Sequence, residues 1–169
     1  MDNKPLNVLF LCTGNSARSI MAEAILGRWG LGKFKSFSAG SVPKGKVHPM
    51  TLELLEKYGF NPDSYRSKSW DEYASAGSPR MDFVFTVCDN ATREVCPVWP
   101  GQPMTAHWGI ADPDQPALSA EGQRELFIRA YRELDHRIKI FTALSLEKLG
   151  RFSLQKKLDE IGKSHPDHK

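Results

Sequence analysis

The chain has 169 residues, a length typical of one domain with a single hydrophobic core. Its hydrophobic fraction of 40% and charged fraction of 25% are ordinary for a soluble protein, and a net charge of +3 is too small to indicate nucleic-acid binding. No run approaches the roughly twenty apolar residues that cross a membrane, and the N-terminus lacks the apolar region of a signal peptide. We therefore expect a cytoplasmic monomer that binds neither nucleic acid nor membrane.

Residues 6–11 form a nearly unbroken apolar run that leads into Cys12, a pattern typical of strands in a parallel sheet. Small and polar residues follow, and a helical pattern begins after them: Thr13, Gly14, Asn15, Ser16, Ala17, Arg18 and Ser19. Small residues let the backbone N–H groups turn inward, and a following helix adds the positive end of its dipole. The loop is therefore predicted to bind an oxyanion. It is not a Walker loop, because the Gly-Lys-Ser/Thr ending is missing.

Three side chains give this predicted cradle its chemistry. Arg18 can bind two oxygens of a tetrahedral anion through its planar fork. A thiol at a helix N-terminus beside a cation has a lowered pKa, so Cys12 is predicted to be a nucleophile aimed at the bound anion. Ser19 can hydrogen-bond the sulfur and ease its departure as a leaving group. The alternative is an inert cysteine at the end of a core strand, which is the common case for an isolated cysteine.

The next elements alternate between helix and strand. Apolar residues recur at helical spacing from Met21 to Trp29, and Gly30 ends this helix. Residues 34–38 alternate as a second strand. It ends in Ala39-Gly40, where the chain can turn close beside the first loop.

A basic loop then precedes a second helix, which begins at His48-Pro49 and is closed by Gly59. Lys44 and Lys46 in this loop are interpreted as solvated, with direct substrate contact as the less favoured alternative. Residues 66–73 predict a short strand and a helical turn.

Residues 82–88 are a strong strand pattern that ends in Cys88, as the first strand ends in Cys12. The ends of parallel strands in a doubly wound sheet border one crevice, so the two cysteines can meet. Cys96 follows eight residues later. A helix between Cys88 and Cys96 would separate them by about 12 Å, whereas a disulfide needs Cα atoms within about 7 Å. Pairing therefore requires this segment to bend or unwind. Cys96 is interpreted as catalytic, with a structural core thiol as the alternative.

The last third of the chain predicts a short strand and two helices. Residues 104–107 form the strand, and Ser119 is the predicted N-cap of a long amphipathic helix that reaches Leu149. Gly150 ends that helix, and a short one follows. We expect a catalytic domain over residues 1–150 and an extension over 151–169 that is partly helical and disordered from Ser164.

Several separate motifs together resemble the low-molecular-weight tyrosine phosphatase superfamily. They are Cys12 to Ser19, Phe37-Ser38-Ala39-Gly40 and Asp112-Pro113. Thr86-Val87-Cys88 and residues 107–113 are more similar to its arsenate reductase branch. The resemblance runs in order over roughly residues 6 to 145. It implies an α/β three-layer sandwich with a small, about four-stranded, parallel doubly wound sheet.

The resemblance also implies a reaction without a cofactor. Cys12 attacks arsenate, for which phosphate is an analogue, and Asp112 protonates the departing oxygen. Without the resemblance, Asp112 before a proline would merely start a turn. Cys88 attacks the sulfur of the Cys12 adduct and releases arsenite. Cys96 then attacks Cys88, and thioredoxin, or glutathione with glutaredoxin, reduces the resulting disulfide.

The alternative reaction is that of a phosphatase, which would use Cys12, Arg18 and Asp112 identically and end with water attacking a phosphocysteine. Tyrosine phosphatases of this superfamily carry tyrosines after the Asp-Pro pair, where this chain has Asp114-Gln115-Pro116. A redox-sensing module without catalysis and a zinc site made by the three cysteines are less favoured. No metal site is expected. Some arsenate reductases bind potassium with the loop Asn, the Ser-Ala-Gly serine and an acidic residue, but here the third position falls within residues 67–69.

Overall fold

The computed structural model of the protein describes residues 4–88 and 99–166. Four strands form one sheet in the order β2-β1-β3-β4. Their bounds are β1 (Leu6–Cys12), β2 (Phe34–Gly40), β3 (Phe83–Thr86) and β4 (Met104–His107). Neighbouring strands are parallel in all three pairs, which confirms the small parallel sheet that the sequence predicts.

Helices and short 3₁₀ turns connect these strands. The helices are α1 (Arg18–Trp29), α2 (Pro49–Lys57), α4 (Ala120–Thr142) and α5 (Arg151–Ile161), and the 3₁₀ turns are η1 (Pro62–Ser64), η2 (Trp70–Tyr73) and η3 (Leu146–Lys148). The Ser119 hydroxyl caps α4 by accepting a hydrogen bond from the backbone N–H of Gly122, as predicted. Each described helix is too short or too polar to cross a lipid bilayer.

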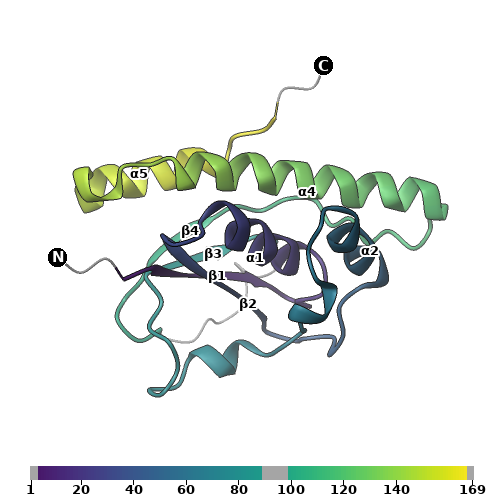
Figure 1. Cartoon of the computed structure of the whole chain (residues 1–169), viewed down its shortest axis with the longest axis horizontal. Helices are drawn as coiled ribbons and strands as arrows, with labels where there is room; N and C mark the ends of the chain where they lie inside the picture. The colour runs from purple at the N-terminus through teal and green to yellow at the C-terminus, as the bar shows by residue number, and fades with distance from the viewer. Residues whose placement is uncertain (1–3, 89–98, 167–169) are drawn as a thin grey trace.

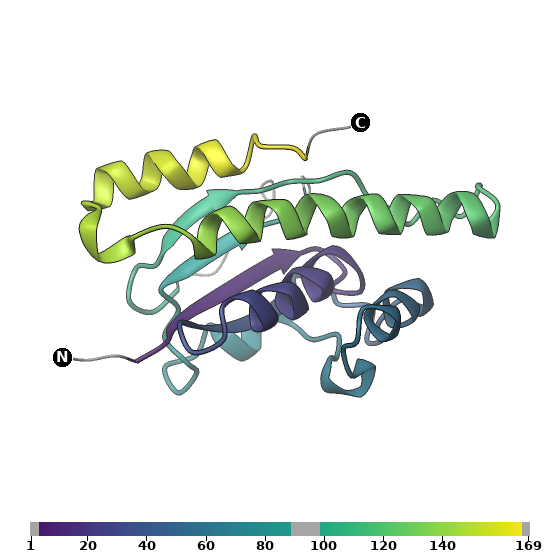
Figure 2. The same ribbon diagram turned by 45° about the horizontal axis from the view of Figure 1, so that its top comes forward.

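The two faces of the sheet are covered differently. Alternate residues of β1 point to opposite faces, as in any strand. Val8 and Phe10 pack with α1, α4 and α5 in the main core, whereas Leu9 and Leu11 pack with the η2 segment on the opposite face. Figures 1 and 2 show α4 and α5 side by side on the face that α1 also covers. Helix α2 packs against the outer side of α1.

The register of the two central strands brings Cys12 and Cys88 together. Leu11 lies opposite Thr86 in the β1–β3 pair, and the N–H of Val87 donates to the carbonyl of Leu11 (2.9 Å). Cys12 and Cys88 therefore leave the sheet side by side at its carboxyl edge, which is where ligands bind in open α/β sheets. The predicted meeting of these cysteines is confirmed.

Gly40, the last residue of β2, lies against the loop that follows β1. A Cβ atom at this position would lie 2.5 Å from the carbonyl oxygen of Thr13 and 2.8 Å from that of Cys12. Only glycine fits such a close approach of two backbones. The predicted close turn beside the first loop is therefore present.

Three element boundaries differ from the sequence prediction. Helix α4 ends at Thr142 rather than at Leu149, because the chain tightens through a bond from the Leu144 N–H to the Phe141 carbonyl and turns into η3. Gly150 serves as the N-cap of α5. Within residues 66–73, the strand is reduced to a single bridge between Gly40 and Ser69.

Candidate active site

The loop between β1 and α1 turns its carbonyl groups outward. The carbonyl oxygens of Thr13, Gly14 and Ser16 accept hydrogen bonds from backbone N–H groups of the loop over residues 42–48. A trans peptide directs its N–H opposite to its C=O, so the N–H groups that follow these carbonyls face the inside of the loop. Ala17 precedes α1 and has no side chain that could cap the helix, which leaves the helix N–H groups to a ligand. This is the geometry of an oxyanion cradle.

Asn15 holds the cradle in its curled shape. Its backbone is left-handed, with φ of 44°, a conformation that asparagine tolerates better than most residues. The side chain is fully buried, and its Nδ2 donates to the hydroxyls of Ser19 (2.7 Å) and Ser38 (3.1 Å). Its Oδ1 accepts from the backbone N–H of Lys68 (2.9 Å). Asn15 therefore ties the cradle to α1, β2 and the chain beyond η1.

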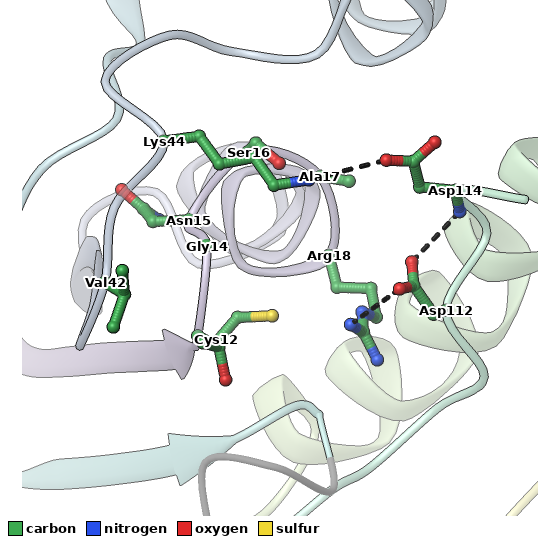
Figure 3. Close-up of a pocket in the computed structure, with 11 residues that line it drawn as sticks. Cys12, Gly14, Asn15, Ser16, Ala17, Arg18, Val42, Lys44, Asp112 and Asp114 are labelled. Carbon is green, nitrogen blue, oxygen red and sulfur yellow. Dashed lines mark hydrogen bonds and ion pairs between the residues drawn. The ribbon is translucent and has the colours of Figure 1, made fainter. Parts of the chain in front are cut away.

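A pocket of about 370 Å³ opens over the cradle. Figure 3 shows the Cys12 side chain pointing into it, with Arg18 on one side and Lys44 above. The lining residues come from the cradle, from the loop after β2 and from the loop after β4: Cys12, Thr13, Gly14, Asn15, Ser16, Ala17, Arg18, Val42, Lys44, Asp112 and Asp114. The predicted nucleophile, anion ligands and acid therefore share one pocket.

Arg18 joins the cradle to the loop that carries Asp112. Its Nη1 donates to the carbonyl of Ile110 (3.0 Å), and its Nη2 lies 3.7 Å from Oδ2 of Asp112. The other carboxylate oxygen of Asp112 accepts the backbone N–H of Asp114 (2.9 Å). Asp112 is half exposed at the mouth of the pocket, where a leaving oxygen would emerge. This placement suits a general acid.

Lys44 is exposed, as the sequence predicts, and it also lines the mouth of the pocket. Its aliphatic carbons lie directly over Gly14, and its Nζ reaches Oδ2 of Asp114 (3.4 Å) across the pocket. The other oxygen of Asp114 accepts from Nε2 of Gln123 (2.8 Å) and lies 3.3 Å from Nε2 of His48. The His48 Nε2 is the donor, because its Nδ1 accepts a backbone N–H. A polar bridge thus spans the mouth.

Cys12 and Cys88 are a contacting pair of buried thiols, 6% and 1% exposed. The backbone N–H of Thr13 donates to the Cys88 sulfur (3.3 Å). The hydrogen bond to Cys88, and then burial, raise the pKa of the Cys12 thiol above its ordinary value, although Arg18 and the N–H of Gly14 lower it. The lowered pKa that the sequence predicts is therefore wrong for the paired thiol. Arg18, the cation invoked for it, does act in that direction, as does the N–H of Gly14 in the loop, but the neighbouring thiol and burial outweigh both.

Replacing Cys88 with alanine is expected to lower the pKa of Cys12, because it removes the largest cause of the rise. The iodoacetamide alkylation rate of the Cys12 peptide, measured by mass spectrometry against pH, should show a midpoint about one pH unit lower or more. Both proteins should carry Cys96→Ser, so that the thiol outside the described residues does not compete. An unchanged or higher midpoint would contradict the assignment.

An ion pair between buried Lys68 and mostly buried Glu23 supports the cradle from behind. Lys68 Nζ lies 3.7 Å from Oε1 of Glu23, 3.4 Å from the Ser38 hydroxyl oxygen and 2.9 Å from the carbonyl of Arg66. The Ser38 hydroxyl donates to Glu23 (2.5 Å). Burial raises the pKa of Glu23 and lowers that of Lys68, and each charge opposes the shift of the other. The pair therefore keeps both groups closer to their charged forms.

This cluster does not fit a potassium ion. Asn15 and Ser38 are the two residues that the resemblance places around such an ion, but the Asn15 oxygen accepts the Lys68 N–H, and an ammonium lies beside Ser38. A second cation there would be repelled by Lys68. Among the described residues, no group of three or more His, Cys, Asp or Glu side chains could hold a metal ion.

Lys68→Met is expected to destabilise the protein by about 3 kcal/mol at pH 7, because Glu23 loses the partner of its buried charge. Without Lys68 the pKa of Glu23 in the folded state rises further above its unfolded value. The loss should therefore grow with rising pH and shrink as the pH falls toward about 4. Urea unfolding at several pH values measures it. Adding Glu23→Gln should restore most of the stability, and a pH-independent loss would contradict this explanation.

Most of the predicted site residues lie at one pocket. Cys12 to Arg18 and Asp112 line the pocket, and Cys88 contacts its floor through Thr13. Ser19 is buried and accepts a hydrogen bond from Asn15, while its contact with the Cys12 sulfur stays a prediction. Cys96 lies outside the described residues. Sequence reasoning missed the roles of Glu23, Lys68 and Asp114, which depend on partners far along the chain.

Comparison with known proteins agrees with this geometry. Residues 7–155 match the family described as low molecular weight phosphotyrosine protein phosphatase. An arsenate reductase of Halalkalibacterium halodurans is 34% identical over 138 residues, which cover 79% of this chain and 93% of that protein. The crystal structure of an arsenate reductase from Archaeoglobus fulgidus aligns with a TM-score of 0.63 and 26% identity, over 81% of this chain and 99% of that one.

A thioredoxin-dependent arsenate reductase of Corynebacterium glutamicum aligns with a TM-score of 0.60 and 26% identity, over 88% of this chain and 66% of that one. These likenesses agree with the motifs around Cys12, Ser38 and Asp112, and the family match over residues 7–155 includes the cradle and the loop after β4 that carries Asp112, here called the acid loop. The chain belongs to the low molecular weight phosphotyrosine protein phosphatase family, and within that family it is similar to arsenate reductases.

Proposed function

We propose that this protein reduces arsenate to arsenite by a relay of three cysteine thiols. The observation that carries the proposal is the second buried thiol at the cradle: Cys88 hydrogen-bonds Cys12 and accepts the N–H of Thr13. Hydrolysis of a phosphate ester has no use for a second thiol in that place. Reduction of an oxyanion bound to Cys12 requires one.

In the first step the cradle N–H groups and Arg18 hold arsenate over the Cys12 sulfur. The arsenate dianion offers negative charge to Arg18 and to the end of α1, and the Cys12 proton passes to an arsenate oxygen as the sulfur attacks arsenic. An S–As bond forms and an As–O bond breaks. Asp112 gives a proton to the departing oxygen, which leaves as water.

In the second step the Cys88 thiolate attacks the sulfur of the adduct. An S–S bond forms, the S–As bond breaks, and its electron pair stays on arsenic, which leaves as arsenite. The N–H of Thr13 stabilises the Cys88 thiolate, since it already donates to that sulfur. Two electrons pass from the two thiols to arsenic, and a Cys12–Cys88 disulfide remains.

In the third step the Cys96 thiolate attacks the Cys88 sulfur and frees Cys12. A dithiol reductant then reduces the Cys88–Cys96 disulfide by the same exchange chemistry. We propose thioredoxin as this reductant, because a structurally similar arsenate reductase is described as thioredoxin-dependent. Glutathione with glutaredoxin is the alternative.

A phosphomonoesterase activity is the second candidate function, because the cradle, Arg18 and Asp112 serve a phosphate ester equally well. The pocket mouth argues against an aryl substrate. None of the described residues that line the pocket is aromatic, and Lys44 and Asp114 bridge the space that a phenyl ring would enter. Desolvating this pair without replacing its bonds costs free energy. We therefore expect only weak hydrolysis of p-nitrophenyl phosphate.

The deciding experiment measures arsenite formation by wild type with thioredoxin, thioredoxin reductase and NADPH, and separately with glutathione and glutaredoxin. Arsenite should form with thioredoxin, and Cys96→Ser should stop multiple turnovers there. If only the glutaredoxin arm is active, and Cys96→Ser remains active in it, the reductant and the third step are wrong. If wild type hydrolyses p-nitrophenyl phosphate efficiently and forms no arsenite in either arm, the second candidate function replaces the first.

A further inference from the structure

Arg137 is a buried arginine whose role lies outside the pocket. It projects from α4 and is 1% exposed. All the hydrogen bonds that the described chain offers its guanidinium come from main-chain carbonyl oxygens: Trp108 (2.7 Å), Gly109 (3.2 Å) and Ser164 (3.1 Å). Burial lowers its pKa, and nearby Glu133 opposes that shift. Removing a cation from water costs free energy, so the groups that Arg137 binds indicate its functional role.

Two of these carbonyls begin the loop that carries Asp112. Arg137 binds the carbonyls of Trp108 and Gly109, and the next carbonyl along the chain, that of Ile110, accepts from Arg18. Three successive carbonyls are thus held by two guanidinium groups from different helices. Asp112 follows two residues after Ile110. The backbone that leads into Asp112 is therefore held at three consecutive carbonyl groups.

The third carbonyl connects this loop to the segment after α5. Ser164, predicted to be disordered, accepts from Nε of Arg137, and its hydroxyl lies 2.6 Å from Nε2 of His136. The indole N–H of Trp108 donates to the carbonyl of Leu158 (2.9 Å). A Cβ atom at Gly162 would lie 2.4 Å from the carbonyl oxygen of His107. The C-terminal segment therefore packs against the start of the acid loop.

The packing of Trp108 makes this support rigid. Its ring is fully buried and stacks on Phe85 of β3, with centroids 3.9 Å apart and planes at 11°. Phe141 of α4 meets it edge-on. The family match ends at residue 155. Leu158, Gly162 and Ser164 lie beyond that match.

We propose that Arg137 is a positioning residue for Asp112, and that it acts together with residues 158–164. The guanidinium fixes the carbonyls of Trp108 and Gly109 relative to α4 and the C-terminal segment, and thereby holds the Asp112 carboxylate at the pocket mouth. Small displacements of a catalytic group lower the rate strongly. The proposal rests on the proposed function in one respect, namely that Asp112 is the general acid of the reaction.

Arg137→Met is expected to lower kcat for arsenate about 10-fold to 100-fold, within the range that a general acid contributes. The KM for arsenate should change less than about twofold, because Arg137 does not touch the cradle. Arg132→Met is the matched control, since it removes an exposed arginine from the same helix. Arg137→Lys should recover part of the rate by keeping one donor to these carbonyls.

A double-mutant cycle with Asp112→Asn separates positioning from general damage. If Arg137 acts through Asp112, the Met substitution should lower kcat less than twofold in the Asp112→Asn background. A full additional loss in that background would overturn the proposal.

Hydrogen exchange gives a readout that needs no arsenate activity. In Arg137→Met the amides of residues 108–114 should exchange at least about tenfold faster, while those of β1 and α1 keep their protection. Gly162→Ala, which pushes on the His107 carbonyl, should produce the same local change and serves if Arg137→Met does not fold. Uniform loss of protection, or no change at 108–114, would overturn the proposal. If wild type forms no arsenite but the exchange pattern is as expected, the proposed function fails while the support of the loop stands.

Discussion

Cys88→Ser is expected to abolish repeated arsenate turnover, lowering the rate by about 10³-fold or more. A serine hydroxyl cannot form the S–S bond that drives arsenite out of the Cys12 adduct. Arsenate should still bind, because the cradle and Arg18 are unchanged. Arsenite release measures the loss, and mass spectrometry of the rapidly quenched protein should detect arsenic retained on Cys12.

The same variant separates the two candidate functions. Hydrolysis of p-nitrophenyl phosphate needs Cys12, Arg18 and Asp112 but not Cys88, so its rate should stay within a few-fold of wild type. Thr105→Ser, a similarly small change in β4 away from the pocket, is the control for folding. Normal arsenite formation by Cys88→Ser would show that the second thiol plays no part in the reaction.

Arg18→Ala is expected to lower kcat/KM for arsenate by about 10³-fold, comparable with the loss of an oxyanion-stabilising donor. The substitution removes the cation beside Cys12 in the pocket, the ion pair with Asp112 and the bond to the carbonyl of Ile110. Both substrate binding and the position of the acid should suffer. Steady-state kinetics should therefore show a higher KM and a lower kcat together.

Arg18→Lys is the matched variant, since it keeps the charge and loses the planar fork. It should recover part of KM and little of kcat, because an ammonium lacks the planar fork that places two parallel N–H groups on the anion while another donates to the Ile110 carbonyl. The inhibition constant of phosphate should rise in both variants. An Arg18→Ala protein with unchanged phosphate inhibition would place the anion elsewhere in the pocket.

The pocket places an anion-binding site beside a pair of thiols, Cys12 and Cys88. The cradle needs only small residues, a helix N-terminus and Arg18, and these serve phosphate and arsenate alike. In the proposed function the chemistry diverges at Cys88, which the β1–β3 register places beside Cys12. In that proposal, one side chain at the end of a strand separates a reductive site from a hydrolytic one.

Local patterns predicted the frame of the protein well. Apolar runs identified β1 and β3, an alternating pattern identified β2, and the Ser119 cap identified the start of α4. Such signals act over a few residues, so the sequence displays them directly. The end of α4 was predicted too late, because Leu144 and its neighbours keep an apolar pattern while the chain has already turned.

The electrostatic state of Cys12 could not be predicted from the loop alone. Arg18 and the N–H of Gly14 lower its pKa, as their positions in the sequence indicate. The opposing influences are burial and Cys88, which lies 76 positions further along the chain. Only the folded sheet determines how deeply the Cys12 thiol is buried and that it contacts the Cys88 sulfur.

Arg137 is the one support that the sequence could have revealed. It lies three residues after Leu134 and four before Phe141, both of which are fully buried on the core face of α4. An arginine at such a position is buried and must find partners. Which partners it finds is decided by the tertiary structure.

The sequence by itself determined the strands, the anion cradle and the residue types of the chemistry, because backbone shape and side-chain reactivity there depend on near neighbours. Only the tertiary structure decided the pairing of Lys68 with Glu23, the bridge of Lys44 to Asp114 and the hold of Arg137 on the acid loop. Each of these contacts joins residues about thirty to seventy positions apart. They form because folding around the sheet brings segments that are distant in the sequence into contact.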